Sequence, residues 1–403
     1  MLVTVRPALI PENSITKDSG CEEFLRLCLS SRWSPENLTK AVDLYNASGF
    51  AWSPVIDLAQ KEHTSPLMYR ALRDATDVPP EILKIFYKDY LWWGRHNLLV
   101  FHELGKLLHV LDGNNISVIL LKGVALAENL YDNMALRPLR DMDILVHFED
   151  RYALIELLKP LNYRLKEIEV HDTATFEYEN EIVLMKTGEP EYYLDFHWNL
   201  LDSMYYQHVV DVDWFWQTAV PVSIDGIETM ILGPEAQILH LCSHLSIHHQ
   251  NEGLLWFNDI AMLLHKYNDK LDWTVLLDQA VQFDLVLSLQ NTLLKVVKEW
   301  AIDVPRGILD RLLTLDVSVN EKRIHERRRS DTRLVARRFY TDLSEIPGWS
   351  SRLRYALLHF FPSITYMKRR YDIRHPYLLP FYYPYRWLVG LASVVRLSLL
   401  DEK

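Results

Sequence analysis

The sequence predicts an α+β protein in which a mixed β-sheet core is flanked by N-terminal and C-terminal helical regions. Residues 20–110 and 233–315 show the apolar spacing of amphipathic helices. Between them, short β-branched runs alternate with helical segments, which is typical of a compact sheet domain. The chain has 403 residues, more than one typical domain holds, so we expect two or three domains.

The first helical region is divided by prolines. Pro35, Pro54 and the Pro79-Pro80 pair separate its apolar-periodic segments, because proline interrupts helices and favours turns. Pro80 also suits the first turn of the long helix predicted after it.

The central region contains the predicted sheet. We expect strands at residues 116–121, 142–147, 174–185 and 191–197, and helices at residues 125–131 and 149–162. Farther on, Asp225-Gly226 stands between two β-branched runs and is a favoured two-residue turn, so a hairpin is expected at residues 222–229. After the second helical region, a charged helix is expected at residues 321–340.

Charge is distributed unevenly along the chain. The net charge is −11, yet residues 322–403 hold 17 Lys and Arg against 7 Asp and Glu, which leaves −21 on residues 1–321. The basic part is either a solvated face that packs on the acidic body or a surface for an anionic partner or membrane. Residues 369–387 interleave basic and aromatic residues. We expect them to form a strap over the helical core; the alternative is a segment that binds RNA or a membrane surface.

Neither membrane spans nor disulfides are expected. No apolar run reaches 18 residues, and prolines interrupt the N-terminal apolar run, so no transmembrane segment or signal peptide is predicted. The three cysteines lack metal-ligand spacing and favour a reduced compartment. We therefore expect a soluble cytoplasmic protein.

Two aspartates precede a predicted buried strand. Asp141 and Asp143 are followed by the apolar run Ile144-Leu145-Val146, and alternate strand residues point to the same face, so both carboxylates project together. Like charges held this close are costly unless a cation joins them. Oxygen ligands favour Mg²⁺ or Mn²⁺, and such a site suits phosphoryl or nucleotidyl transfer.

A third acid stands in the last predicted strand of this region. Asp195 and His197 alternate with Leu194, Phe196 and Trp198, so the acid and the histidine share the polar face, and His197 is a candidate for substrate binding. Three carboxylates from neighbouring strands can hold two divalent cations. The alternative is a structural cluster of ion pairs.

Three motifs carry a family resemblance. They are LKG at residues 121–123, RPLRDMDILV at residues 137–146 and LDFHW at residues 194–198. Together they resemble the DNA polymerase β-like nucleotidyltransferase superfamily and, more narrowly, a poorly characterised bacterial group of nucleotidyltransferase family proteins with the motif LKG…RPxxDxDLLV…DLHW. Further segments that look like that group, at residues 63–69, 240–259 and 361–371, extend the resemblance over most of the chain.

The resemblance implies roles for particular residues. Asp141 and Asp143 match the metal-binding pair, Asp195 matches the third carboxylate, and Gly123 matches the glycine that lets the backbone approach the nucleotide phosphates. Many members have Gly-Gly or Gly-Ser where this chain has LKGV, so a hydroxyl contact to phosphate is missing and Lys122 is expected to supply charge instead. The long gap between Gly123 and Asp141 resembles the antibiotic-modifying branch, which favours a small-molecule acceptor.

Two arginines flank the acid pair. The guanidinium groups of Arg137 and Arg140 could bind triphosphate oxygens bidentately. The alternative is an ion pair with Asp141 or a neighbouring carboxylate. This alternative is as strong as nucleotide binding for Arg137 and stronger for Arg140.

Histidines cluster on a helix of the second helical region. His244 and His248 are four residues apart, near His240 and His249, a spacing that can bind zinc. We expect His244 and His248 to face the acidic cleft and bind substrate without closing a zinc site, and Asp259 to orient one of them. The alternative is a polar helix face that only packs towards the cleft.

We therefore predict metal-dependent transfer of a nucleoside monophosphate from an NTP to an acceptor, with release of pyrophosphate. A small-molecule acceptor is favoured over protein or RNA, and the tail is expected to make at most weak contact with an anionic surface. The expected parts are an N-terminal helical domain (1–110), a catalytic domain (111–215), a C-terminal helical domain (216–330) and a basic aromatic tail (331–403).

Two alternatives to this function stay open. One is a non-catalytic nucleotide-sensing or partner-binding module on the same fold, although the intact set of three acids speaks against a degenerate site. The other is a histidine/aspartate metal phosphohydrolase built on residues 240–259, which lack the expected His-Asp dipeptide.

Overall fold

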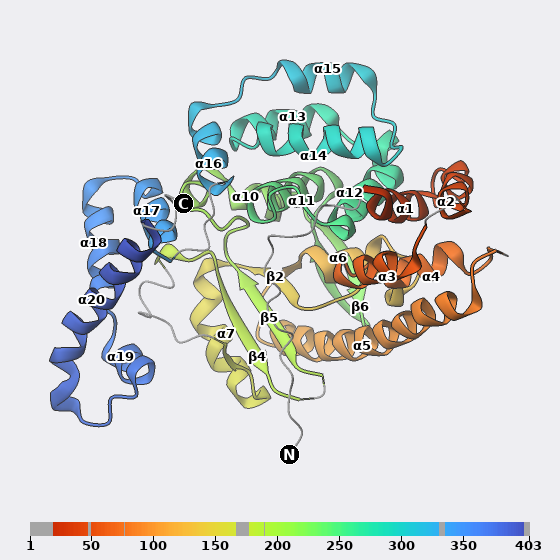
Figure 1. Cartoon of the computed structure of the whole chain (residues 1–403). Helices are drawn as coiled ribbons and strands as arrows, with labels where there is room; N and C mark the ends of the chain where they lie inside the picture. The colour runs from red at the N-terminus through yellow and green to blue at the C-terminus, as the bar shows by residue number, and fades with distance from the viewer. Residues whose placement is uncertain are drawn as a thin grey trace.

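The computed structural model describes residues 19–46, 50–75, 77–166, 177–188, 190–329 and 335–398. Figure 1 shows a β-sheet with helices packed around it and, at the left of the view, a helical arm formed by the last of these ranges. The expected α+β class, a mixed sheet flanked by helical regions, is confirmed.

In the described residues, five helices precede the sheet. They are α1 (Ser19–Ser30), α2 (Glu36–Asn46), α3 (Trp52–Lys61), α4 (Ser65–Leu72) and α5 (Pro80–Asp112). Pro80 is the first residue of α5, where the missing N–H costs no helical hydrogen bond. Phe24, Met68 and Phe86 are fully buried in a core that also contains Phe257 and Trp300. The N-terminal helices therefore pack with helices that lie far along the sequence.

The described part of the sheet has seven strands in the order β3-β4-β5-β2-β1-β7-β6. The strands are β1 (Val118–Leu120), β2 (Met142–Val146), β3 (Arg164–Leu165), β4 (Glu181–Lys186), β5 (Tyr192–His197), β6 (Val220–Ile224) and β7 (Ile227–Ile231). β2 runs parallel to β5 and antiparallel to β1, so the sheet is mixed. The strand predicted at 174–185 is β4, and residues 167–176 lie outside the described residues.

Both faces of the central strands are buried. Val118 and Leu120 of β1 pack with α5 and with α7 (Arg151–Leu158), whereas Ile119 points into the core shared by the N-terminal and C-terminal helices. Ile119 is paired with Leu145 of β2, which lies in the same core. Asp143 precedes Leu145 by two residues and so points to that same side of the sheet.

The predicted hairpin is present and extends the sheet. Asp225 and Gly226 have φ angles of 51° and 80°, and positive φ at both central residues is the mark of the type I′ turn that suits a two-residue hairpin. β7 also pairs in parallel with β1. The sheet therefore continues past residue 215, where the sequence alone placed the end of the catalytic domain.

Helices follow the hairpin as expected. Two short helices, α9 (Tyr206–Val209) and α10 (Val212–Gln217), lie before it, and the later ones are α11 (Pro234–His248), α12 (Leu254–Tyr267), α13 (Trp273–Gln282), α14 (Val286–Glu299), α15 (Arg306–Thr314) and α16 (Val319–Arg329). Local sequence explains their starts. Pro234 opens α11, and the Asp272 side chain caps α13 by accepting the N–H groups of Thr274 and Val275 at 3.0 Å each.

The prediction that residues 369–387 form a strap over the helical core is wrong. The C-terminal part folds instead as α17 (Val335–Glu345), α18 (Trp349–Phe360), α19 (Ile364–Tyr371) and α20 (Leu379–Ser398), which project from the body (Figure 1). The prolines did not prevent a helix here, since Pro384 lies inside α20. The charged helix expected at 321–340 corresponds to α16 and α17, and residues 330–334 between them lie outside the described residues.

Within the described residues, no helix combines the length and the apolar character needed to cross a membrane.

Candidate active site

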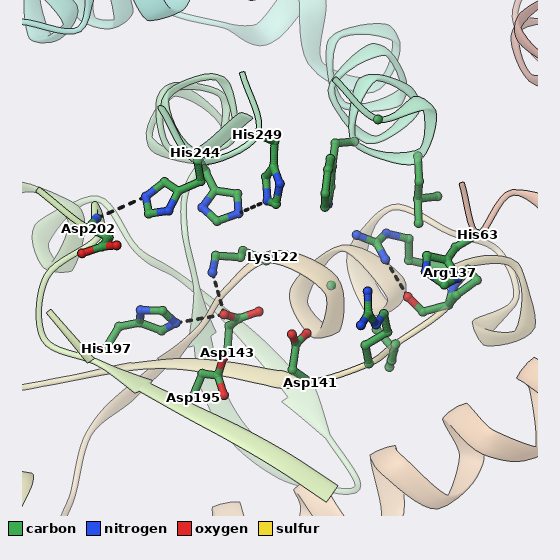
Figure 2. Close-up of a pocket in the computed structure, with 18 of the residues that line it drawn as sticks. His63, Lys122, Arg137, Asp141, Asp143, Asp195, His197, Asp202, His244 and His249 are labelled. Atoms are coloured by element: carbon green, nitrogen blue, oxygen red, sulfur yellow. Dashed lines mark hydrogen bonds and ion pairs between the residues drawn. The ribbon is translucent and has the colours of Figure 1, made fainter. Parts of the chain in front are cut away.

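The three aspartates lie on or next to two neighbouring central strands of the sheet. Asp143 of β2 is paired in register with Asp195 of the parallel strand β5, and Asp141 immediately precedes β2. All three line a cavity of about 910 Å³. Figure 2 shows them on one side of this cavity, with Lys122 above Asp143 and the histidines of α11 on the far side. The expected grouping of the three acids in one cleft is what the structure shows.

Asp143 is held by two basic side chains. Its Oδ1 atom accepts a hydrogen bond from Lys122 Nζ at 2.6 Å and lies 2.9 Å from His197 Nε2. The other nitrogen of His197, Nδ1, lies 2.8 Å from Glu181 Oε2. The result is a chain of alternating charges across β4, β5 and β2 that ends at Lys122.

Glu181 is a carboxylate that the sequence did not single out. It begins β4 and is paired with His197 across the antiparallel β4–β5 ladder. Its neighbours alternate in burial, with Ile182 and Leu184 in the core and Glu181 towards the cavity. That alternation was a signal in the sequence, but only the strand register shows that Glu181 meets His197.

Charge pairing separates the pKa values of the acids. Burial alone would raise the pKa of Asp143, but Lys122 and His197 hold it well below its usual range. The pKa of Asp195 is raised to about 7 by burial and by the charge of Asp143. Asp141 faces the cavity, and burial together with Asp143 raises its pKa to about 6. Without a cation, Asp141 and Asp195 therefore lack the compensating positive charge that Asp143 receives from Lys122 and His197.

The pKa values of His197 and Glu181 shift in opposite directions. Glu181 and Asp143 outweigh the burial of His197 and raise its pKa to about 9. The pKa of Glu181 is lowered to about 2 because His197 outweighs the burial of the carboxylate. His197 is thus an imidazolium at neutral pH and fixes the orientation of Asp143, the role that outer partners take at metal sites.

The donor set fits a hard divalent cation. Asp195 Oδ1 is buried and makes no hydrogen bond among the described residues, which is costly unless a further partner joins it. Carboxylate oxygens are the ligands that Mg²⁺ and Mn²⁺ prefer. As they stand, however, no three His, Cys, Asp or Glu side chains of the described residues are placed so that they could hold a metal ion together, and Lys122 and His197 already engage Oδ1 of Asp143.

Gly123 follows Lys122 at the start of α6 (Lys122–Asn129), directly after β1. A Cβ atom at Gly123 would meet Leu139 Cδ2 at 3.0 Å and Arg137 Nη1 at 3.8 Å. Lys122 has a φ angle of 42°, a region that costs energy for a residue with a side chain. At this strained turn Lys122 reaches Asp143, and both Lys122 and Gly123 line the cavity.

Arg137 lines the cavity, but its guanidinium group is held by Asp259 and the Pro138 carbonyl. Its Nε atom donates to Asp259 Oδ1 and Oδ2 at 3.0 and 2.9 Å, Nη2 lies 2.8 Å from Oδ2, and Nη1 donates to the Pro138 carbonyl at 2.6 Å. Of the two interpretations of Arg137, the ion pair is therefore present, with Asp259 as the partner. Arg140 is exposed at the cavity. Its charge opposes the rise in the pKa of Asp141 without reversing it, and burial together with this charge lowers the pKa of His63.

The role expected for Asp259 is wrong. Asp259 is fully buried and binds Arg137 and the Tyr131 hydroxyl, at 2.6 Å from its Oδ1 atom, rather than orienting a histidine. The sequence placed it three residues after Trp256 on α12, and only the tertiary packing shows that this face of α12 meets the Arg137 loop.

The helical histidines line the cavity opposite the acids. His244, His248 and His249 come from the end of α11. His249 Nε2 lies 3.1 Å from His244 Nε2, and the His249 ring stacks on Trp256 with centroids 3.6 Å apart. His248 Nε2 accepts the backbone N–H of Asp202 at 3.2 Å.

The imidazoles of His244 and His249 are neutral at physiological pH. Burial and the charge of Lys122 hold the pKa of His244 well below its usual range and lower that of His249 to about 4. Cys242, between His240 and His244, is fully buried in the helical core, so it points away from them. We call the side of the cavity formed by Lys122 and the carboxylates its floor, and the side formed by the imidazoles at the end of α11 its roof.

The chain belongs to a family described as uncharacterised nucleotidyltransferases, whose sequence pattern matches residues 48–301. The matched range contains all three aspartates, Lys122 and the α11 histidines, and the family resemblance is thereby confirmed. No curated protein sequence matches the chain. A crystal structure of an antigenic nucleotidyltransferase-like protein from Paracoccidioides brasiliensis is 16% identical, with a TM-score of 0.33, over 55% of this chain and 94% of that one.

Proposed function

We propose that this protein transfers a nucleoside monophosphate from an NTP to a small-molecule acceptor. The observation that carries the proposal is the in-register pair Asp143 and Asp195, with Asp141 beside them, on the wall of a large polar cavity. The acceptor oxygen attacks the α-phosphorus, the bond from that phosphorus to the β-phosphate bridging oxygen breaks, and pyrophosphate leaves. Nucleotides are cytoplasmic metabolites, so the cytoplasm is the proposed location.

The acids form the proposed cation site. Asp141, Asp143 and Asp195 would hold Mg²⁺ or Mn²⁺, which when bound supplies charge compensation at the phosphate and favours ionisation of the attacking hydroxyl. His197 holds Asp143 in place through its own contact with Glu181. Asp195, the carboxylate on the acceptor side of the site, takes the acceptor proton.

The donor nucleotide is proposed to bind beside α6. Gly123 lines the cavity there, and its proposed role is to let the phosphates approach the backbone; close packing of its Cα against Leu139 also leaves no room for a larger residue. Lys122 and Arg140 supply positive charge that can meet triphosphate oxygens. Arg137 contributes its charge from a fixed position, since Asp259 holds its guanidinium.

The acceptor is proposed to bind under the imidazole roof. A cavity of about 910 Å³ is within the range of small-molecule sites. A neutral imidazole can both donate and accept hydrogen bonds, so His244 suits a hydroxyl-bearing acceptor, and we propose that His248 beside it contacts the same acceptor. His197 remains a charged residue of the floor. The size of the cavity favours such an acceptor over protein or RNA.

Product mass tests this proposal. The protein is incubated with each NTP, Mg²⁺ or Mn²⁺ and fractionated metabolites, and we expect one metabolite to gain the mass of a nucleoside monophosphate. The Asp195→Asn variant is the matched control and should yield no product. An NTP that binds without any product across all fractions would favour the non-catalytic module instead.

A further inference from the structure

Exposed apolar side chains gather on the C-terminal arm, which we define as helices α17–α20. Of the 26 large apolar side chains that are exposed in the described residues, 13 lie between Tyr340 and Val389. Single exposed apolar residues are normal, but a concentration of them marks a surface that interacts with a protein or a membrane.

One stripe of these side chains runs along α18. Trp349, Leu353 and Leu357 are 78%, 52% and 49% exposed and recur every four residues, which places them on one helical face. Tyr355 of the same helix is buried in a small cluster with Ile346. The helix is thus anchored through one face and turns an apolar face to the outside.

A second stripe runs along α20. Phe381, Tyr385 and Leu388 are 74%, 53% and 67% exposed at helical spacing. The Trp387 indole N–H donates to the carbonyl of Phe360, the last residue of α18, at 2.8 Å, and Figure 1 shows both helices at the outer edge of the arm. The two stripes therefore belong to one packed unit.

The arm is basic where the stripes lie. Residues 349–390 contain seven Lys and Arg and one acidic residue, Asp372. Lys368, Arg369 and Arg370 are consecutive and exposed at the end of α19, the helix between the stripes. Residues 1–321, in contrast, carry a formal charge of −21.

We propose that the arm docks on an anionic phospholipid surface. The stripes of α18 and α20 would insert at the interface, where Trp and Tyr rings are favoured, and residues 368–370 would meet headgroup phosphates. Charge selects this occupant and its orientation, because an anionic surface attracts the arm and repels the acidic body. In the described residues no helix can span a membrane, so the attachment is peripheral.

Vesicle sedimentation tests the proposal with the full chain. We expect the protein to bind vesicles of phosphatidylcholine mixed with phosphatidylglycerol about tenfold more tightly than vesicles of phosphatidylcholine alone, and to be released by salt. The double variant Trp349→Ser/Phe381→Ser and the triple variant Lys368→Gln/Arg369→Gln/Arg370→Gln should each weaken binding about tenfold.

A matched control lies on α5. Trp92 and Leu98 are 57% and 58% exposed, so Trp92→Ser/Leu98→Ser removes similar apolar surface away from the arm and should leave binding unchanged. All substituted residues are exposed, and circular dichroism checks that the variants fold. Equal binding to both kinds of vesicle, or no binding, would overturn the proposal. A dimer in light scattering that is lost in Trp349→Ser/Phe381→Ser, without lipid binding, would assign the face to a second copy of the chain.

Discussion

The carboxylates of the site differ in their partners although they line the same cavity. Asp143 is buried and engaged by Lys122 and His197, whereas Asp195 has a buried oxygen without a hydrogen bond in the described residues. The sequence spacing alone predicts that neutralising Asp143 relieves repulsion between carboxylates. The structure indicates instead that only Asp141 and Asp195 are under repulsion in the metal-free protein.

Neutralising Asp143 and neutralising Asp195 should therefore change stability in opposite senses. Asp143→Asn leaves Lys122 and His197 buried with one partner fewer, and removing one member of a buried pair costs about 3 kcal/mol or more. Asp195→Asn removes an unsatisfied like charge and should leave the free energy of unfolding unchanged or higher. Urea unfolding in EDTA measures both values, and both variants should lose nucleotidyl transfer. A more stable Asp143→Asn protein would contradict the charge pairing.

The raised pKa of Asp195 makes the stability of the metal-free protein depend on pH. An ordinary aspartate titrates at 3.8, but Asp195 in the folded protein titrates at about 7. The folded state therefore binds the proton more tightly, and its stability is complete below the ordinary pKa and falls as pH rises to about 7. Asp141, raised to about 6, acts in the same direction.

The loss from Asp195 is at most about 4 kcal/mol, since one pKa unit is about 1.4 kcal/mol. Buried histidines with lowered pKa values make stability rise over part of this range, so the test is the difference between two proteins. The free energy of unfolding of the wild type minus that of Asp195→Asn, measured in EDTA, should decrease from pH 5 to pH 7. A difference that stays constant over this range would show that the carboxyl is ionised throughout.

Single residues also show which parts of the site the sequence can predict and which it cannot. The alternation of Asp195 and His197 with Leu194 and Phe196 was enough to predict which side chains face the site, because strand geometry has a period of two. Glu181 was missed because its role depends on the β4–β5 register, which no local pattern of the sequence specifies.

Among the structural elements, the loop before β2 and helix α12 are joined by one buried ion pair. Arg137 of the loop and Asp259 of α12 are 6% and 0% exposed, and Tyr131 completes the network. The wall of the proposed nucleotide site is thus held by a helix more than a hundred residues away in the sequence.

Breaking this pair should destabilise the protein more than replacing it. Asp259→Ala leaves a buried guanidinium without its partner, at a cost of about 3–5 kcal/mol, whereas Arg137→Met/Asp259→Leu should recover most of that loss. Chemical denaturation of the two variants and the wild type measures the difference. If the nucleotide needs the Arg137 charge, the double variant should also raise the KM for NTP. Equal stability losses in both variants would show that packing, not charge, joins the loop to α12.

The helices and strands themselves were largely accessible from the sequence. Apolar periodicity and β-branched runs located β1, β2 and β5, and Asp225-Gly226 located the β6–β7 hairpin. The helices of the C-terminal arm could not be predicted from the sequence in the same way. The prolines and aromatics at residues 376–387 suggest an irregular strap by composition, whereas α20 packs through contacts such as that between Trp387 and Phe360.

At the scale of the whole molecule, the site lies between parts that are distant in the sequence. β2, β4 and β5 provide the floor of the cavity, α11 provides the roof, and His63 at the end of α3 lines its edge. The helices of residues 19–112 and 234–300 share one core, so the cavity is bounded by a single packed body. The arm stands outside this body and does not line the cavity. We propose that small molecules bind in that cavity.

Position-specific labelling of the nucleotide tests the central claim most directly. The protein is incubated with Mg²⁺, its acceptor fraction and an NTP labelled either at the α-phosphorus or at the γ-phosphorus. Nucleotidyl transfer predicts that the α label enters the acceptor while the γ label appears only in pyrophosphate, and that Asp143→Asn abolishes both. A γ label in the acceptor, or label released only as inorganic phosphate, would contradict the account.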